Sequence, residues 1–436
     1  MGPAVPFWGA SSNRGRPGVT QFFELEAAWR TTRLDGLLAD PAWAEEGALA
    51  ESIDPAAASN PLRVEMIGFE NLRRHAAEWS DLAGRALERN VFWQPDFALP
   101  FLQHARHPKN LRFLLAWRNT ATGETERLMA LWPVITPATP NKPYETWRHE
   151  YCCHGAPLLD RAEAAACLDA IVSHLRSEGG ATPILSLTMV PSRGPLFSLV
   201  TSFAARIGLA VAQVAEYRRA VVDATEAGRL ATDSFSSKKR KELRRLSRRL
   251  YEKGDISFGV AETGEALNQH IESFLALEAK GWKGKKGGAL LARPERAVFA
   301  RAMLRGMAHE GRCQIYWMAC GERVIASNIL LRDADRAYFW KTAYDEEFSA
   351  FSPGVLLTLR MTDALLQDPG LSGIDSCAIP NHSMIDHIWR NREPFVDIML
   401  ACRPDLSAAL RGALRRERFR RWLRDQAKAL LNKARR

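Results

Sequence analysis

The sequence predicts an α/β protein of two tandem modules, each with a mixed, mainly antiparallel sheet flanked by helices, followed by a basic C-terminal helix. Two observations lead to this expectation. The 436 residues are enough for two or three domains, and 46% hydrophobic against 25% charged residues is the balance of a chain that forms cores. In addition, the order of apolar runs in the first half returns in the second half after about two hundred residues.

Residues 1–61 precede these runs and are expected to be largely disordered. They are rich in Ala, Gly, Pro and Ser and show no sustained hydrophobic periodicity. Such a composition buries too little apolar surface to offset the entropy lost on ordering. Ordered structure is therefore expected to begin near Leu62.

The first module is expected to span residues 62–225. Leu111–Trp117 and Leu128–Ile135 are apolar runs on either side of a turn-rich segment, which is typical of an antiparallel hairpin. The elements expected after the hairpin are a helix at Ala162–Leu175, a strand at Ile184–Val190, a helix at Leu196–Ile207 and a strand that ends near Val222.

The second module, residues 226–402, repeats this order. Its hairpin strands are expected at Cys313–Ala319 and Val324–Leu331. The elements expected after them are a strand at Ala337–Thr342, a helix at Val355–Leu366, a strand at Gly373–Ser376 and a strand at Phe395–Ala401. The helix is apolar nearly all round, which indicates that it lies buried between layers.

The segment before that helix is the clearest candidate for a ligand site. Ser352 suits the N-cap, Pro353 suits the first turn, and Gly354 lets a ligand approach the backbone. The first-turn amides, which include those of Val355 and Leu356, and the helix dipole both favour an anion such as a phosphate. Simple helix capping is the alternative interpretation of the same residues.

This order of elements resembles the Gcn5-related N-acetyltransferase (GNAT) fold, in which the loop after the fourth strand holds the pyrophosphate of coenzyme A. More closely, residues 233–401 resemble the acetyltransferase domain of CelD-like cellulose-biosynthesis proteins, distant relatives of the FemAB peptidyltransferases. The segments that carry the resemblance are Ser236–Leu250, Phe274–Gly284, Gly321–Ala326, and Tyr344 with Ser352–Gly354. The resemblance implies that Ser352–Leu356 bind an acyl-CoA donor such as acetyl-CoA.

The sequence departs from the family at one place. Many relatives carry Tyr-Lys-x-x-Trp after the last strand of the fold, whereas Ile385-Asp-His-Ile-Trp389 stands here. The role of that lysine is therefore not implied for this chain.

Two basic segments are expected to contact substrates. Lys280–Gly288 combines flexible glycines with the charge of Lys283 and the flat ring of Trp282, and in a GNAT protein it would border the acceptor site. The helix Ser236–Lys253, which contains Arg245, has nine Lys and Arg against two Glu, a net +7. It suits a nucleotide-linked donor, RNA or anionic lipid. A flexible connection and a solvated basic face are the alternatives.

Four titratable residues are candidates for the chemistry. Attack of an acceptor on a thioester needs a base, an oxyanion donor and an acid for the departing thiolate. Asp375, His382 and His387 follow the strand at Gly373–Ser376 and are candidates for the base. Tyr344, just before the Ser-Pro-Gly turn, is the candidate for the thiolate acid. For each of them a structural role is the alternative.

The compartment follows from the cysteines and the N-terminus. The seven cysteines are odd in number and form no CxxC pair, so they are expected to be reduced core thiols, with no metal site. The first thirty residues lack a signal-peptide pattern. We therefore expect a cytoplasmic protein.

The net charge of +10 is concentrated in two places. The helix at 236–253 gives +7 and the tail at 405–436 gives +8, which leaves −5 for the rest. A nucleic acid is therefore not expected as a partner, except tRNA in one alternative below. The tail, residues 403–436, is expected to be basic, amphipathic and helical, and a change of hydrophobic phase near Gly412–Arg416 predicts either a kink or a division into two short helices. Its second apolar stripe suits peripheral contact with an anionic inner membrane, and packing against the domain is the alternative.

Together these features predict an acyl-CoA-dependent N- or O-acyltransferase that transfers an acetyl group to a small amine, amino sugar or polysaccharide precursor. The first module would be a degenerate copy that shapes the acceptor cleft. One alternative is a FemAB-like transferase that uses aminoacyl-tRNA, whose RNA would contact the basic helix. The other is a non-catalytic scaffold for exopolysaccharide machinery.

Overall fold

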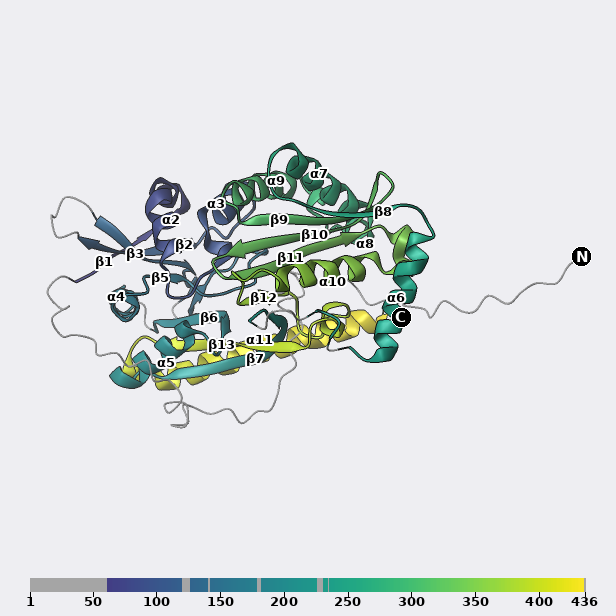
Figure 1. The fold of residues 1–436 in the computed structure, drawn as a ribbon. Coiled ribbons are helices and arrows are strands. Elements are labelled where there is room, and N and C mark those ends of the chain that lie inside the picture. The colour runs from purple at the N-terminus through teal and green to yellow at the C-terminus, as the bar shows by residue number, and fades with distance from the viewer. Residues whose placement is uncertain are drawn as a thin grey trace, which may run out of the picture.

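The computed structural model describes residues 61–434, apart from 120–125, 140–141, 179–181, 226–229 and 234. The predicted disorder of residues 1–61 thus falls almost entirely outside the described residues. Within the described part, thirteen strands form one sheet, and twelve of them follow the order β1-β2-β3-β4-β6-β13-β7-β12-β11-β10-β9-β8, while β5 pairs with β3 (Figure 1).

The first half of the chain contributes seven strands and five helices. The strands are β1 (Arg63–Ile67), β2 (Leu111–Asn119), β3 (Glu126–Ile135), β4 (Tyr144–Thr146), β5 (Leu158–Leu159), β6 (Ile184–Pro191) and β7 (Val211–Asp223). The helices are α1 (Phe69–Leu72), α2 (Ala76–Gly84), α3 (Pro95–His104), α4 (Ala164–Ser177) and α5 (Pro195–Ile207). The hairpin, helices and strands predicted for this half are thereby confirmed.

The second half repeats the series. Its strands are β8 (Ile256–Ala261), β9 (Cys313–Cys320), β10 (Arg323–Asp333), β11 (Arg336–Tyr344), β12 (Gly373–Asp375) and β13 (Asn391–Ala401). Its helices are α6 (Ser237–Tyr251), α7 (Gly264–Lys280), α8 (Trp282–Lys285), α9 (Pro294–His309), α10 (Pro353–Leu366) and α11 (Ser407–Ala434). All six predicted elements of this half are present.

The strand order reads as two related halves. Counted from the two edges of the sheet, β1 corresponds to β8, β2 to β9, β3 to β10, β4 to β11 and β6 to β12. The pairs β4–β6 and β11–β12 are parallel, whereas their neighbours in the sheet are antiparallel. At the centre the last strands are exchanged, because β13 lies between β6 and β7, and β7 lies between β13 and β12. The fold is thus two GNAT-like modules joined in one sheet.

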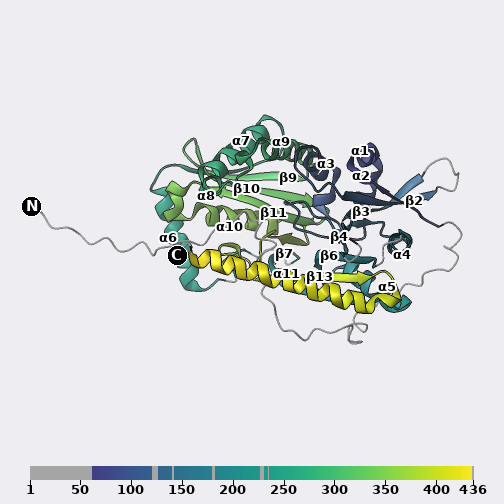
Figure 2. The ribbon, with the colours of Figure 1, turned by 180° about the vertical axis from the view of Figure 1, so that it is seen from behind.

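Helices cover both faces of this sheet. Helices α2 and α3 of the first half and α7 and α9 of the second lie on one face, while α4, α5, α10 and α11 lie on the other (Figures 1 and 2). Alternation along β2 explains the two layers: Phe113 and Leu115 join one core, and Leu114 and Ala116 join the other. The predicted burial of α10 is confirmed by Leu357, Met361 and Leu365 among others.

The C-terminal tail forms one continuous helix, α11. The predicted division into two short helices near Gly412–Arg416 is therefore wrong. The change in hydrophobic phase instead separates a docked part from an exposed part, since Leu410 and Ala413 are buried against the sheet while Phe419 and Trp422 are exposed.

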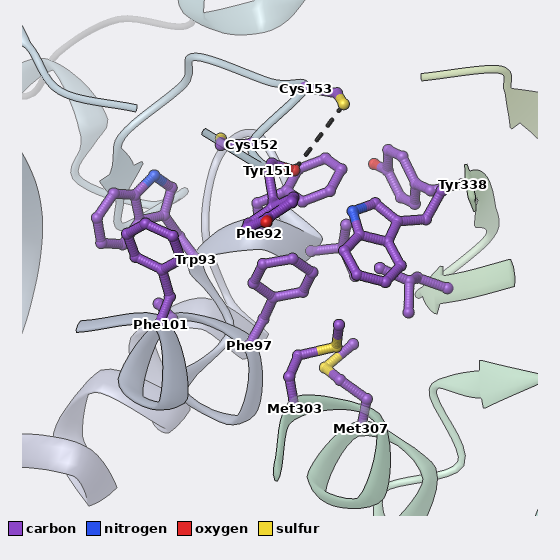
Figure 3. Close-up of a cluster of buried hydrophobic side chains, with 14 of the residues drawn as sticks. Phe92, Trp93, Phe97, Phe101, Tyr151, Cys152, Cys153, Met303, Met307 and Tyr338 are labelled. Carbon is purple, nitrogen blue, oxygen red and sulfur yellow. Dashed lines mark hydrogen bonds between the residues drawn. The ribbon is translucent and has the colours of Figure 1, made fainter. Parts of the chain in front are cut away.

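The core on the α3–α9 face joins the two halves. Figure 3 shows Phe92 and Phe97 of the first half meeting Tyr338, Met303 and Met307 of the second half. The rings of Phe92 and Tyr338 lie 5.7 Å apart in an edge-on arrangement. Because this core draws on both halves, neither half has a complete hydrophobic core of its own on this face.

A histidine sits inside this core. His149 is 1% exposed, its ring is stacked on those of Phe97 and Phe101, and its Nε2 lies 3.2 Å from the carbonyl oxygen of Phe92. Burial disfavours the imidazolium and lowers the pKa of His149 from 6.5 to about 3. The folded state therefore keeps this ring neutral.

This burial predicts acid lability. Below pH 6.5 this histidine is protonated in the unfolded chain, whereas in the folded protein it stays neutral until the pH approaches 3. The free energy of unfolding therefore falls as the pH falls through this window. Between pH 7 and 4.5 the loss from this one group is expected to be about 2 kcal/mol in urea titrations. A His149→Phe variant should lack that part of the loss, whereas the exposed-site control His309→Phe should retain it. Equal pH dependence of the two variants would contradict the assignment.

Candidate functional site

The candidate site lies where two parallel strands of the second half separate. Strands β11 and β12 pair only at Arg336–Tyr338 with Gly373–Asp375, and β11 then continues to Tyr344 paired with β10 on its other side. The free end of β11 is flanked by the end of α7, by α8 and by the loop that leads to α10. Strands that separate in this way leave room for a ligand between them at the topological switch.

A small cavity opens beside this strand end. It measures about 150 Å³ and is lined by Leu277, Lys280, Gly281, Lys285, Tyr344, Asp345, Glu346 and Glu347. The lining thus comes from the α7–α8 turn on one side and the β11–α10 loop on the other.

Ion pairs hold these two walls together. Lys280 lies 2.8 Å from Glu347, and Lys285 lies 2.6 Å from Glu346. Glu346 also accepts a hydrogen bond of 2.6 Å from the backbone amide of Trp282. Arg323 of β10 pairs with Asp345, Nε to Oδ2, at 2.9 Å. The cations at the mouth are thereby matched with carboxylates of the loop.

A buried carboxylate lies behind the cavity. Glu278 of α7 is 2% exposed; its Oε1 lies 3.5 Å from the Nζ of Lys283 and 3.1 Å from that of Lys341, and its Oε2 accepts a hydrogen bond from the amide of Leu290. Burial opposes its ionisation, but the two lysines outweigh burial and lower the pKa of Glu278. The carboxylate is therefore ionised and fixes both ammonium groups.

Lys283 is the most perturbed base of the cluster. Burial, and secondarily the charge of Lys341, lower its pKa from 10.5 to about 8, against the opposing effect of Glu278. Its Nζ donates a hydrogen bond of 2.9 Å to the carbonyl oxygen of Thr342 on β11. A buried lysine with a pKa near the working pH can exist in the neutral form that accepts a proton.

A chain of hydrogen bonds connects this lysine to α10. The Thr342 hydroxyl donates to the Asn328 side chain at 2.7 Å, and the Asn328 amide donates to the Thr358 hydroxyl at 3.3 Å. The Thr358 hydroxyl donates to the carbonyl oxygen of Gly354 at 2.7 Å. The position of Lys283 and that of the first turn of α10 are therefore coupled through buried groups.

The start of α10 differs in one respect from its prediction. Ser352 occupies the N-cap position, but its φ of +53° is left-handed and its side chain makes no cap hydrogen bond, so the predicted capping hydroxyl is wrong. The Ser352 carbonyl instead accepts from the amides of Val355 and Leu356. Pro353 has no amide hydrogen. Within the described residues, the Gly354 amide is the first-turn donor that makes no hydrogen bond.

Tyr344 packs directly on this first turn. A Cβ built on Gly354 would lie 3.5 Å from the Tyr344 ring, so the two residues are in contact distance and a methyl group fits. Burial raises the pKa of Tyr344, which keeps its phenol protonated at neutral pH. The hydroxyl is thus available as a proton donor.

His382 has a defined tautomer. Its Nδ1 accepts hydrogen bonds of 3.3 Å from the amides of Met384 and Ile385, which places the ring proton on Nε2. Burial, and secondarily the charge of Lys283, lower its pKa to about 4. The ring is therefore neutral at pH 7 and presents an N–H donor rather than a lone pair.

The remaining predicted residues lie in other environments. Asp375 is 2% exposed and pairs with Arg219 at 3.0 Å, so its carboxylate is committed to an ion pair. His387 is exposed. Arg245 is exposed on α6 and pairs with Glu242 at 2.7 Å. Trp282 is half-buried, with Lys286 5.4 Å from its ring.

Sequence reasoning missed three members of the site, Glu278, Lys341 and Thr342. Glu278 had a detectable signal, because it lies between buried residues of a helix whose apolar face should exclude an unpaired carboxylate. Lys341 interrupts an apolar strand in the same way.

Among the described residues, no group of three or more His, Cys, Asp or Glu side chains could hold a metal ion. The described cysteines are free, and all but Cys320 are buried.

Residues 237–382 match the family model of the acetyltransferase (GNAT) domain. These residues of the second half therefore form a domain of the GNAT type. The narrower likeness to CelD-like proteins remains a prediction.

Similar solved structures share little sequence with the chain. FemX is 9% identical, with 78% of this chain and 98% of that chain covered at a TM-score of 0.48. The C-terminal domain of a putative lysylphosphatidylglycerol synthetase from Agrobacterium fabrum is 14% identical, with 78% and 94% covered at 0.44. A tandem GNAT protein from the clavulanic acid biosynthesis pathway is 13% identical, with 78% and 99% covered at 0.37. No curated protein matches the sequence significantly.

Proposed function

We propose that the protein is a cytoplasmic acyl-CoA-dependent N- or O-acyltransferase, which transfers an acetyl group from acetyl-CoA to a small amine, amino sugar or polysaccharide precursor. The observation that carries the proposal is the chain of hydrogen bonds that links Lys283, a buried lysine of lowered pKa, to the first turn of α10 beside separated strands. The donor pyrophosphate would bind at Ser352–Leu356, where the Gly354 amide is available. The pantetheine arm would then run between β11 and β12.

The side chains around the strand end can carry each proton of a direct transfer. The acceptor nitrogen or oxygen attacks the thioester carbon while neutral Lys283 takes its proton. The N–H on Nε2 of His382 stabilises the negative charge that develops on the carbonyl oxygen. The carbon–sulfur bond then breaks, and the thiolate takes the proton of the Tyr344 phenol. Before the next cycle, Lys283 releases its proton to solvent and the Tyr344 phenolate takes one up from solvent.

The acceptor is expected to enter from the α8 side. Trp282 offers a flat surface for a sugar ring, and the mouth of the cavity is lined by Lys280 and Lys285. The first module, residues 62–225, adds Tyr151, whose ring lies 5.6 Å from the Nζ of Lys341. In this proposal the first module shapes the acceptor side, and a precursor of cellulose or another exopolysaccharide is the acceptor class to be assayed first. Peripheral contact with an anionic inner membrane through residues 405–436 is a separate proposal, since it rests on the exposed face of α11 and not on this site.

Calorimetry with acetyl-CoA tests the donor site. Wild type should bind acetyl-CoA, and Gly354→Trp should bind at least about tenfold more weakly because the indole fills the space beside the first turn. The matched control is Gly354→Ala, whose methyl group meets the nearest atom at an ordinary 3.5 Å and should bind within about threefold of wild type. No binding by folded wild type at millimolar acetyl-CoA would overturn the proposal.

A further inference from the structure

The outer part of α11 carries an apolar stripe with no partner among the described residues. Phe419, Trp422, Leu423 and Leu430 are between 47% and 67% exposed. Their spacing places them on one face of the helix. The rings of Phe419 and Trp422 are stacked, with centroids 5.8 Å apart. Four large apolar side chains on one exposed helix face cost solvation free energy unless they meet another surface.

The inner part of α11 fixes which way this stripe points. Leu410 and Ala413 pack on Ala212, Met399 and neighbouring residues of β7 and β13. Farther along the helix, between Phe419 and Trp422 in the sequence, Arg421 forms a 2.8 Å ion pair with the buried carboxylate of Asp397. Because these contacts set the rotation of the helix, the opposite face is held toward solvent.

Cations surround the stripe. Arg411, Arg415, Arg416 and Arg420 are exposed along α11. The basic helix α6 lies at the same end of the molecule as the C-terminal end of α11 (Figures 1 and 2). The +7 helix therefore lies near the C-terminal end of the +8 segment, whose helix α11 runs along the molecule from α5 toward α6, while the rest of the chain carries −5 (Figure 2). This asymmetry orients the molecule in the field of an anionic surface.

We propose that the exposed stripe of α11 lies in the interface of an anionic phospholipid bilayer, with Phe419 and Trp422 inserted among the acyl chains and α6 adding electrostatic attraction. An amphipathic helix with arginines beside an aromatic and leucine face has the chemistry of an interfacial helix. Each cation near an anionic surface adds attraction that salt weakens. Among the described residues, no helix is long and apolar enough to cross a bilayer. The contact is thus peripheral.

Charge favours lipid over two other occupants. A second copy of the chain would bring two tails of like charge together. An RNA would pair its phosphates with the arginines but would leave Leu423 and Leu430 against a polar partner. Of these three occupants, the anionic bilayer is the one that both pairs with the arginines and buries the apolar stripe. The inference does not depend on acyl transfer, since the stripe contributes nothing to the lining of the cavity.

Sedimentation of the full-length protein with vesicles tests the proposal. Wild type should bind vesicles with about 30% phosphatidylglycerol at least about tenfold more tightly than pure phosphatidylcholine vesicles, and high salt should weaken binding. Phe419→Glu/Trp422→Glu should reduce binding to the anionic vesicles by about tenfold or more, and the indole fluorescence of Trp422 should shift to the blue only in the bound wild type. The matched control is Val298→Glu/Val260→Glu, which adds the same charge at exposed apolar positions away from α11.

Three outcomes would overturn the proposal. They are equal binding of wild type and the α11 variant, a dimer in light scattering that the α11 variant abolishes, and salt-sensitive tRNA binding that exceeds vesicle binding. Neutralisation of Arg244 and Arg248 on α6 should weaken vesicle binding less than the α11 variant does, by about threefold. Acetyl-CoA affinity, measured on the Phe419→Glu/Trp422→Glu variant, should be unchanged, so failure of the membrane proposal and failure of the acyltransferase proposal give different results.

Discussion

Alanine at position 283 is expected to slow acyl transfer by about a hundredfold or more, because a positioned general base contributes about 10²–10⁴ to the rate. Lys283 is fixed by Glu278 and by the carbonyl of Thr342, and its pKa of about 8 lets the amine accept a proton near neutral pH. The measurement is single-turnover transfer from acetyl-CoA to an amine or amino sugar acceptor. The affinity for acetyl-CoA should change little, since the hydrogen bonds of Thr342, Asn328 and Thr358 that lead to Gly354 do not involve the lysine itself.

Two controls separate proton transfer from charge. Wild-type activity should rise with pH and level off above about 8, since the folded pKa of Lys283 lies there and only the unprotonated amine accepts a proton. Lys283→Arg keeps a cation but cannot lose its proton at these pH values, so it should be as slow as Lys283→Ala. If Lys283→Arg is as active as wild type, Lys283 acts through its charge and is not the base.

Much of the fold was predictable because it depends on local patterns. The hairpins at β2–β3 and β9–β10 are apolar runs around short turns, and α10 is a buried helix whose sequence is apolar on nearly every side. The exchange of β7 and β13 was not predictable. Each pairs with strands far away in the sequence, and nothing in their own composition distinguishes the neighbour in one half from that in the other.

The candidate site, too, was predictable from the sequence only in part. The Ser352–Gly354 start and the Trp282–Lys283 segment carry local signals, and both contact the end of β11, Gly354 beside Tyr344 and Lys283 at the carbonyl of Thr342. Asp375 looked like a free carboxylate because the sequence does not reveal Arg219 on the neighbouring strand β7. The tautomer of His382 is likewise a property of its loop, since the amides that bond to Nδ1 follow it in a turn.

Replacing Arg219 by methionine is expected to lower the free energy of unfolding by about 3–5 kcal/mol, which is the usual cost of removing one partner of a buried ion pair. Arg219 is fully buried, pairs with Asp375 of β12 at 3.0 Å and donates to the carbonyl of Cys153 at 2.7 Å. Its guanidinium also lies 3.9 Å above the ring of Phe395 on β13. One side chain therefore ties together the exchanged strands at the centre of the sheet.

Urea unfolding at pH 7 measures this effect. The matched control is Arg218→Met on the same strand, where the side chain is exposed and the change should stay within about 0.5 kcal/mol. Asp375→Asn leaves the Arg219 charge buried without its carboxylate and should also cost several kcal/mol, by the same reasoning about unpaired buried charge. Equal stability of Arg219→Met and wild type would mean that the pair contributes no net stabilisation.

The same Asp375→Asn variant distinguishes the two roles proposed for this carboxylate. If Asp375 were the general base, folded protein would lose about a hundredfold in turnover and the rise of activity toward pH 8 would disappear. If Asp375 only holds Arg219, turnover per folded molecule should stay within about threefold of wild type and the alkaline rise should persist, because Lys283 still supplies it. We expect the second result, since the Asp375 carboxylate is buried and already engaged in a 3.0 Å ion pair with Arg219.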